Sequence, residues 1–331
     1  MKICILGAGS WGTALAFHLQ NNGHQINLWS IDPAQVEELN KTRHNHLIPD
    51  VYLLEEINVT NSLPQSLVGI EGVVFAVPSN AMRSTALSAA SYWPSNAWAA
   101  SVSKGLEPQT HLRLSEVLTL NLPPRTPVAV LSGPSHAEEV ALKLPTTVVA
   151  ASNNLSLAQT VQDVFHSEYF RVYTSKDLLG VEMGGSLKNV IAIAAGILDG
   201  LGLGDNTKAA LMTRGLYEMT RLGVALGADA KTFAGLAGMG DLTVTCISRH
   251  SRNRLLGEKI GQGKTLEQAL SEITMVAEGL NTAKAALDLA ETVGVELPIT
   301  QEVHNVLFKG KAASEAIKSL LARVAKPEND L

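Results

Sequence analysis

The first residues of the chain constrain its fold more tightly than any other stretch. Lys2–Leu6 is a short run rich in β-branched and aliphatic residues, Gly7-Ala-Gly-Ser-Trp-Gly12 follows it, and a helical pattern then runs to Gly23. The order strand, G-x-G-x-x-G, helix is typical of a dinucleotide-binding unit. In that motif Gly7 permits the tight turn, Gly9 lets a pyrophosphate approach the backbone, and Gly12 allows close packing of helix and strand. We therefore predict a cofactor-binding loop at these glycines, with phosphates bound by the free N–H groups of the helix start.

Ser10 and Trp11 lie inside this loop, where both are predicted to contact the cofactor. The alternative for Trp11 is an aromatic side chain of the core or of a lid. A second strand, Gln25–Trp29, leads to Asp32, at about the offset where an acidic residue binds the ribose 2′-hydroxyl. A carboxylate at that place repels a 2′-phosphate, so the cofactor is predicted to be NAD or NADP, with NAD favoured.

Further strand signals alternate with helical segments through the first half of the chain. The predicted elements are strands at Val73–Val77, Ala97–Val102, Val128–Leu131, Thr146–Ala150 and Phe170–Tyr173, and a helix at Thr110–Leu120. Repeated β-α units with near-continuous apolar strands favour the α/β class, with a Rossmann-like, doubly wound parallel sheet covered by helices on both faces. Ligands bind at the carboxyl ends of such strands, where this pattern places Lys104 and the turn Gly133-Pro-Ser135. The alternative for Lys104 is a solvated loop lysine.

From Asp177 onward only helical patterns follow one another. The predicted helices cover 181–199, Lys208–Leu226, Leu255–Ile260, Leu266–Ile273, Thr282–Val293, Ile299–Phe308 and Ala313–Leu321. The sequence therefore predicts a dinucleotide-binding domain at residues 1–176 and an all-α substrate-binding domain at residues 177–331. The cleft between two such domains is the default ligand site.

The stretch Val181–Asp199 reads as a helix too apolar to lie on a surface. Lys188 and Asn189 stand in its middle, at a depth where an ammonium and an amide both need partners. A desolvated lysine with a tuned pKa can exchange protons near neutral pH, which makes Lys188 a candidate general acid or base. Gly184 and Gly185, one turn earlier, permit a close approach to the backbone. The alternative is a structural lysine paired with a carboxylate such as Glu182.

Two further polar motifs follow in the helical half. Asp241 and Thr245 lie at positions i and i+4 of a predicted helix. Ser251-Arg-Asn-Arg254 immediately precedes a segment with helical apolar periodicity, and Ser251 is predicted to be the N-cap of that helix. Arg252 and Asn253 then occupy a first turn, where free N–H groups, the helix dipole and a guanidinium fork favour a phosphate. The alternative is an ordinary capped surface helix with solvated arginines.

Bulk properties exclude several classes of protein. The chain has 331 residues and a formal net charge of −5, so it lacks the basic surplus that nonspecific nucleic-acid binding requires. Two cysteines, Cys4 and Cys246, are too few for a disulfide framework or a zinc cluster, and they favour a reducing, cytoplasmic location. His136 and His250 show no metal-ligand spacing, so no metal site is predicted.

Neither a signal peptide nor a membrane span is predicted. The apolar run near the N-terminus stops at Gly7, where a better explained motif begins. No stretch is expected to reach the length that a bilayer requires, because Asp199 interrupts the apolar part of the central helix.

Taken together, these motifs resemble the NAD(P)-dependent glycerol-3-phosphate dehydrogenases of the bacterial type. The resemblance covers almost the whole chain. It rests on Gly7-Ala-Gly-Ser-Trp-Gly-Thr-Ala14, Ser103-Lys-Gly-Leu-Glu107, Ser132-Gly-Pro-Ser135, Lys188-Asn-Val-Ile-Ala192, Gly240-Asp-Leu242, Ser251-Arg-Asn-Arg254, Glu278-Gly279 and Pro298-Ile-Thr300. Several blocks in the family's order make the match more specific than the glycine motif alone.

The resemblance implies roles for particular residues. Lys188 matches the proton donor and acceptor, and Lys104 and Asp241 are placed with it as catalytic residues. The residues implied to bind the glycerol phosphate are Lys104, Gly133, Ser135, Lys188, Asp241, Ser251, Arg252 and Asn253, to which we add Asn189 and Thr245. Those implied to contact the cofactor, besides the glycines, are Ser10, Trp11, Lys104, Ala137, Arg252, Val276 and Glu278.

One departure from the family pattern concerns the cofactor. Family members often carry His or Arg near the positions of Ser30 and Ile31, where a cation helps to hold a 2′-phosphate. The absence of such a cation here argues against a strong preference for NADP. Lys41 and Arg43 follow not far along this chain, so the choice stays open, with NAD slightly favoured.

The resemblance and the residues imply one mechanism, in which the cofactor delivers hydride to the carbonyl carbon of dihydroxyacetone phosphate while Lys188 gives a proton to the oxygen. Lys104 is expected to add positive charge near that oxygen, and Asp241 to hold Lys188. Burial and a second lysine lower the pKa of Lys188 whereas Asp241 raises it, so the net sign stays open. The enzyme would supply glycerol 3-phosphate for phospholipid synthesis.

Two other classes remain open at this point. A β-hydroxyacid dehydrogenase shares the glycine loop and a lysine-asparagine pair, but its carboxylate substrate gives no reason for the Ser251-Arg-Asn helix start. A non-enzymatic nicotinamide sensor would keep Gly7–Gly12 without needing a proton-transfer lysine. The sequence leaves the oligomeric state open, with the helical half able to supply a surface for a homodimer.

Overall fold

The computed structural model describes residues 1–48, 51–273, 277–325 and 327–328. Contacts divide the chain into two compact units. The α/β unit comprises Met1–Glu107 and Leu112–Leu178, and the helical unit comprises Pro108–His111 and Leu179–Leu331. The short segment Pro108–His111 thus belongs with the helices, although it lies in the half of the chain that the sequence assigns to the sheet.

The α/β unit is built on one sheet of eight strands in the order β3-β2-β1-β4-β5-β6-β7-β8. These strands are β1 (Lys2–Leu6), β2 (Gln25–Trp29), β3 (Asn58–Thr60), β4 (Gly72–Phe75), β5 (Trp98–Ser101), β6 (Val128–Ser132), β7 (Thr146–Ala151) and β8 (Phe170–Ser175). The order runs outward from β1 in both directions, as in a doubly wound fold. The sheet is not wholly parallel as predicted, because β7 pairs with β6 in the antiparallel sense.

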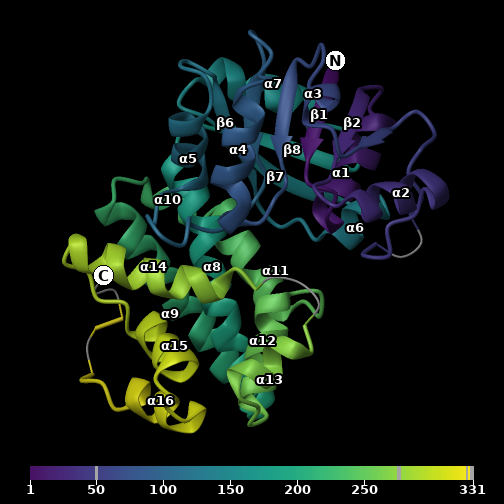
Figure 1. Cartoon of the computed structure of the whole chain (residues 1–331). Helices are drawn as coiled ribbons and strands as arrows, with labels where there is room; N and C mark the ends of the chain where they lie inside the picture. The colour runs from purple at the N-terminus through teal and green to yellow at the C-terminus, as the bar shows by residue number, and fades with distance from the viewer. Residues whose placement is uncertain (49–50, 274–276, 326, 329–331) are drawn as a thin grey trace. The chain divides into compact units, whose positions relative to one another are not determined.

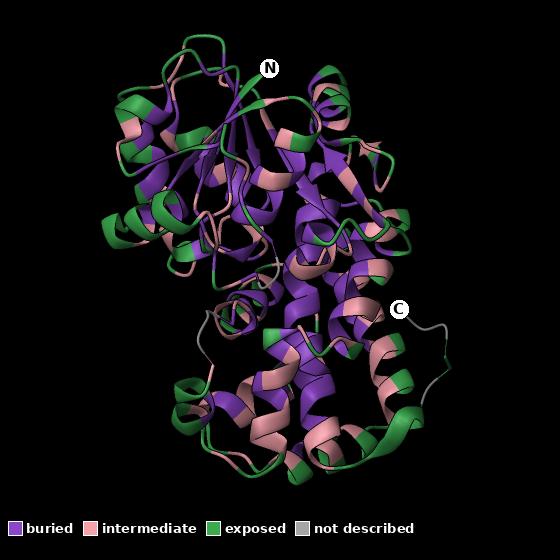
Figure 2. Ribbon diagram, turned by 90° about the vertical axis from the view of Figure 1, so that its right-hand side faces the viewer, coloured by how far each residue is buried: buried purple, intermediate pink, exposed green. Residues whose placement is uncertain are grey.

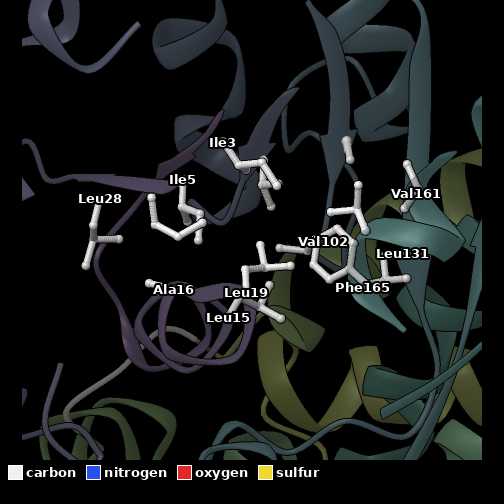
Figure 3. Packing of buried hydrophobic residues seen from close by; sticks show 14 of the residues in the cluster. Ile3, Ile5, Leu15, Ala16, Leu19, Leu28, Val102, Leu131, Val161 and Phe165 are labelled. Atoms are coloured by element: carbon white, nitrogen blue, oxygen red, sulfur yellow. The ribbon is translucent and has the colours of Figure 1, made fainter. Parts of the chain in front are cut away.

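Helices cover both faces of this sheet (Figure 1). They are α1 (Ser10–Asn21), α2 (Pro33–Thr42), α3 (Leu63–Ser66), η1 (Ser79–Ala81), α4 (Met82–Ala90), α5 (Leu114–Asn121), α6 (Ala137–Ala141) and α7 (Leu155–Phe165). Alternate residues of β1 serve the two faces. Ile3 and Ile5 belong to one buried cluster with residues of α1 and α7, several of which Figure 3 labels. Cys4 and Leu6 belong to a second cluster, with residues of α4 and α5. The predicted α/β class with a doubly wound sheet is confirmed.

The helix predicted at Thr110–Leu120 begins only at Leu114. The residues before Leu114 form a loop that is closed by one backbone hydrogen bond. The Glu107 N–H donates to the Leu112 carbonyl oxygen at 3.0 Å. His111, the residue before Leu112, adopts a positive φ of 58°. A local helical pattern does not reveal such a loop, in which Pro108–His111 is grouped with the helical unit.

Among the described residues of the helical unit, helices are the only regular secondary structure. They are α8 (Leu178–Gly200), α9 (Gly204–Ala225), α10 (Ala230–Phe233), a π-helical turn η2 (Leu236–Gly240), α11 (Asp241–Ile247), α12 (Arg252–Gly261), α13 (Leu266–Ser271), α14 (Gly279–Thr292), α15 (Pro298–Phe308) and α16 (Ala313–Leu321). Every residue of α8 from Gly180 to Leu198 is buried, so this helix is the core of the unit. Figure 2 shows buried residues gathered on the strands and on inner helices, with exposed residues on the outside.

Helix α8 is also long and apolar enough, by length and composition, to cross a membrane. The expectation that no stretch reaches that length was therefore wrong. All of its most apolar window is buried inside the protein, and burial on every side accounts for the same composition.

A buried histidine of α1 makes the stability of the α/β unit depend on pH. The His18 Nε2 donates to the Phe165 carbonyl oxygen at 2.7 Å, and its Nδ1 accepts from the Tyr169 hydroxyl at 3.0 Å. Both ring nitrogens are thus used by the neutral imidazole. Burial, with a small contribution from His24 and Lys143, lowers the pKa of His18 to about 4.

We predict that the free energy of unfolding falls as the pH is lowered from about 6.5 to about 4. In that range the unfolded chain binds a proton on His18 that the folded chain excludes, and the loss amounts to about 3 kcal/mol. Urea unfolding across this pH range measures it, with His18→Gln as the comparison. A slope that is equally steep in His18→Gln would assign the pH dependence to other groups.

Candidate functional site

The glycine loop after β1 has the geometry of a phosphate cradle. Gly7 has a φ of +116°, and a Cβ added to it would lie 2.7 Å from the Ala76 carbonyl oxygen. A Cβ on Gly12 would lie 1.8 Å from the Gly7 carbonyl oxygen, so both glycines are required by the protein itself. A Cβ on Gly9 would meet no protein atom within 4 Å. Gly9 therefore leaves open space at the N-terminus of α1, where a pyrophosphate fits.

The two polar or aromatic residues of the loop are placed differently. Ser10 is the first residue of α1 and is buried. Trp11 is half-buried, and its indole N–H donates to the Val102 carbonyl oxygen at 3.2 Å, just after β5 ends. The Trp11 ring thus ties the start of α1 to the strand that leads to Lys104.

Three side chains that the sequence did not single out also contact this loop. Thr13, Gln35 and Asn45 all donate hydrogen bonds to the Ala8 carbonyl oxygen. Asn45 lies 37 residues after Ala8 in an irregular segment, so no local pattern points to it.

The end of β2 offers a carboxylate rather than a cation. Asp32 caps α2 by accepting from the Ala34 N–H at 2.9 Å, and it is exposed. The Arg43 guanidinium donates to the carbonyl oxygens of Leu54 and Ile57, so it holds the loop that precedes β3. The Nη2 of Arg43 is thus used within the protein.

Lys104, Gly133 and Ser135 lie together at the carboxyl ends of β5 and β6. The Lys104 Nζ donates to the Gly133 carbonyl oxygen at 2.8 Å and approaches the Ser135 Oγ at 3.4 Å. Ala137, predicted to contact the cofactor, begins α6 directly after this turn and is buried. The structure therefore groups the predicted residues of this edge around one ammonium.

Lys188 and Asp241 form a buried ion pair in the helical unit. The Lys188 Nζ donates to Asp241 Oδ1 at 2.5 Å and to Thr245 Oγ1 at 2.7 Å. Their exposed fractions are 5% for Lys188, 1% for Asp241 and 4% for Thr245. The Thr245 hydroxyl donates to the Asp241 carbonyl oxygen at 2.6 Å, which turns its lone pairs toward the lysine. The ammonium is thus held in one orientation by two partners.

Gly184 explains how Asp241 reaches α8. A Cβ on Gly184 would lie 2.4 Å from the Ala237 carbonyl oxygen, so only glycine lets η2 pack this close. The turn η2 ends at Gly240, and Asp241 follows as the first residue of α11. The close approach that the sequence assigned to Gly184 is made by this turn.

Asn189 and Asn253 join α8 to the start of α12. The Asn253 Nδ2 donates to Asn189 Oδ1 at 3.0 Å, and its Oδ1 accepts from the Gly279 N–H at 3.0 Å, at the start of α14. Ser251 is the N-cap of α12, as predicted, since its hydroxyl accepts from the Arg254 N–H at 3.2 Å. The helix starts of α12 and α14 are thereby joined to α8 at Asn189, the residue that follows Lys188.

The remaining predicted residues lie around these helix starts. Arg252 is the first residue of α12 and is exposed, and Glu278 directly precedes α14. Val276, predicted to contact the cofactor, lies outside the described residues. Among the described residues, no group of three or more His, Cys, Asp or Glu side chains is arranged to hold a metal ion.

These observations define the chain as a Rossmann-type dinucleotide-binding protein with a helical second unit that contains a buried lysine–aspartate pair. Family models narrow the class. The N-terminal model of the NAD-dependent glycerol-3-phosphate dehydrogenases matches residues 2–158, and the C-terminal model matches residues 177–318. The chain belongs to this family.

Individual relatives agree with the family models. The chain is 54% identical to a glycerol-3-phosphate dehydrogenase [NAD(P)+] of Thermoanaerobacter sp., covering 99% of each sequence. It is 47% identical to one of Enterococcus faecalis, covering 99% of this chain and 98% of the other. The crystal structure of the glycerol-3-phosphate dehydrogenase of Coxiella burnetii matches with a TM-score of 0.94 at 40% identity, covering 97% of this chain and 99% of that one.

The placement of α12 depends on a glycine contact with α8. A Cβ on Gly257 would lie 1.9 Å from the Ile193 carbonyl oxygen. We predict that Gly257→Ala lowers the free energy of unfolding by about 1–3 kcal/mol, because α12 must move away from α8. Gly235→Ala is the control, since its added Cβ meets no atom closer than 3.3 Å. Urea unfolding compares the two variants, and equal stability of both would contradict the close packing.

Proposed function

We propose that this chain catalyses the NAD(P)-dependent interconversion of dihydroxyacetone phosphate and sn-glycerol 3-phosphate. The buried Lys188–Asp241 pair carries the proposal, together with the start of α12, which is hydrogen-bonded to Asn189, the residue after Lys188. This arrangement combines Lys188, a group that can transfer a proton, with the start of α12, which is suited to bind a phosphate. The family to which the chain belongs is named for this activity, as the NAD-dependent glycerol-3-phosphate dehydrogenases.

Lys188 is the general acid of the reduction. The bound nicotinamide supplies a hydride to the carbonyl carbon, which converts the C=O double bond to a C–O single bond. Lys188 gives its proton to the resulting oxygen, and in the reverse direction it takes the proton back from the hydroxyl. Asp241 and Thr245 position the Lys188 Nζ for this transfer through their two hydrogen bonds.

Arg252, Asn253 and Ser251 serve the substrate phosphate. A guanidinium at the first position of α12 provides a fork for two phosphate oxygens, and the helix start adds N–H donors with a partial positive charge. The Asn189–Asn253 bond keeps this helix start in a fixed place relative to Lys188. Binding energy from the phosphate is thereby used to orient the carbonyl.

The α/β unit supplies the cofactor site and a second cation. The open space at Gly9 fits the pyrophosphate of NAD or NADP, and Lys104 adds positive charge for the developing oxyanion. The contributions of Ser10, Trp11, Ala137 and Glu278 to the cofactor site follow from their positions in the family motifs. Asp32 favours NAD as the preferred cofactor.

The cellular role follows from the product. We infer that the enzyme supplies glycerol 3-phosphate for phospholipid synthesis in the cytoplasm. The thiols of Cys4 and Cys246 are free and buried, which suits a reducing compartment. A homodimer formed through the helical unit remains a prediction, and light scattering of the purified protein measures it.

Replacement of Lys188 tests the chemical step. We predict that Lys188→Met lowers kcat with dihydroxyacetone phosphate and NADH by about 10²- to 10⁴-fold, because the general acid is lost. Nicotinamide absorbance follows the reaction, with NADH and NADPH used in parallel. The exposed Lys231 on α10 gives the matched control Lys231→Met, which should keep the kcat of the unaltered protein. Near-normal turnover in Lys188→Met would refute the assignment.

Replacement of Arg252 tests the phosphate site. We predict that Arg252→Ala raises KM for dihydroxyacetone phosphate by at least about tenfold, the loss of one charge-assisted hydrogen bond to an anion. Its unfolding midpoint should change little, since this side chain is exposed. Steady-state kinetics and urea unfolding give the two quantities. An unchanged KM would remove Arg252 from the phosphate site.

A further inference from the structure

One peptide group at the centre of the glycine loop is held from outside the loop. The Ala8 carbonyl oxygen accepts from Gln35 Nε2 at 2.9 Å, from Asn45 Nδ2 at 3.0 Å and from the Thr13 hydroxyl at 3.4 Å. Gln35 lies on α2, Asn45 on the segment after α2, and Thr13 on α1. A carbonyl oxygen has two lone pairs, so these donors saturate it and fix the orientation of the peptide plane.

The orientation of this peptide group determines where a cofactor-binding donor points. The Ala8 C=O and the Gly9 N–H belong to one planar trans peptide, in which the two bonds point in opposite directions. Because the C=O is held toward Gln35 and Asn45, the N–H is directed away from them. Gly9 is also the N-cap of α1 and borders the open space described above.

Each of the two amides is itself held in place. Asn45 is 2% exposed, its Nδ2 also donates to Thr13 Oγ1 at 2.7 Å, and its Oδ1 accepts from the Leu47 N–H at 3.1 Å. The Ser30 hydroxyl donates to Gln35 Oε1 at 2.6 Å, which leaves Gln35 Nε2 facing Ala8. Neither amide can rotate without losing a second hydrogen bond.

We propose that Asn45 and Gln35 are positioning residues of the cofactor site, which present the Gly9 N–H to the cofactor pyrophosphate by clamping the Ala8 carbonyl. The proposal rests on a dinucleotide as the cofactor of the proposed function. In this proposal two neutral side chains strengthen the binding of an anion indirectly, by orienting the peptide group that binds it. If the Gly9 N–H points away from the phosphate oxygen, the hydrogen bond between them is much weaker, because its strength depends on the N–H···O angle.

Binding measurements on the full-length protein test the clamp. The variants are Gln35→Met, which keeps the length of the side chain, and Asn45→Leu, with Asn27→Leu as the matched control. Asn27 is half-buried and donates to one carbonyl oxygen, that of Ser66, at 2.8 Å away from the loop. Fluorescence of NADH gives its Kd, and displacement of NADH gives those of ADP and adenosine.

We expect Gln35→Met to raise the Kd of NADH and of ADP by about five- to tenfold, the effect of one weakened hydrogen bond to a charged group. The Kd of adenosine, which has no phosphate, should change less than about twofold, and Asn27→Leu should change none of the three. Asn45→Leu should act in the same direction. If Asn45→Leu does not fold, Gln35→Met decides, because its side chain is only half-buried.

Two results would overturn the clamp. One is an unchanged Kd of ADP in Gln35→Met, and the other is an equal loss for ADP and adenosine, which indicates general damage to the unit. Failure of the unaltered protein to bind either NADH or NADPH would instead overturn the cofactor assignment, and the clamp with it. The unaltered protein therefore distinguishes the two failures.

Discussion

The buried ion pair between Lys188 and Asp241 is the interaction around which the helical unit is organised. An ammonium that is only 5% exposed requires a partner, and removing the partner of a buried charge costs about 3–5 kcal/mol. Asp241 lies 53 residues after Lys188, so the chain must bring a second element against α8. Because Gly184 has no side chain, η2 can pack directly against the backbone of α8, and Asp241 is the residue that follows η2. The residue proposed for proton transfer therefore also helps to hold α11 against α8.

The same helix fixes the elements that follow in the chain. Helix α12 approaches α8 through Gly257, and Asn253 connects the starts of α12 and α14 to Asn189.

Glu218 of α9 accepts hydrogen bonds from the Ile299 N–H at 2.5 Å and from the Thr300 N–H at 3.1 Å, and it thereby caps α15. Burial raises the pKa of Glu218 to about 7. Pro298-Ile-Thr300 thus provides the first N–H groups of α15 that Glu218 caps, which gives this block a structural role.

Local patterns in the sequence predicted the local structure well. Strands β1 and β2, the glycine loop, the Ser251 N-cap and the placement of Asp241 and Thr245 on one helix all follow from short-range periodicity and capping rules. Local rules did not predict three other features, which are the antiparallel pairing of β7, the loop at Pro108–His111 and the side chains that donate to the Ala8 carbonyl oxygen. Each depends on contacts between residues distant in sequence, for which a single chain carries no periodic signal. Function was predictable because the family motifs are local.

The chain shows how a protein of net negative charge can be built to bind anions. Its formal charge of −5 argues against phosphate binding only if charge acts at long range. Solvent and salt screen distant charges beyond about 10 Å, so the donors in contact decide. Helices α1 and α12 both start without an acidic residue in the first turn. In the proposed sites, the donors at α1 are peptide N–H groups oriented by neutral amides, and α12 adds a guanidinium. Directed hydrogen bonds, and not the overall charge, therefore make these helix starts suitable for phosphates.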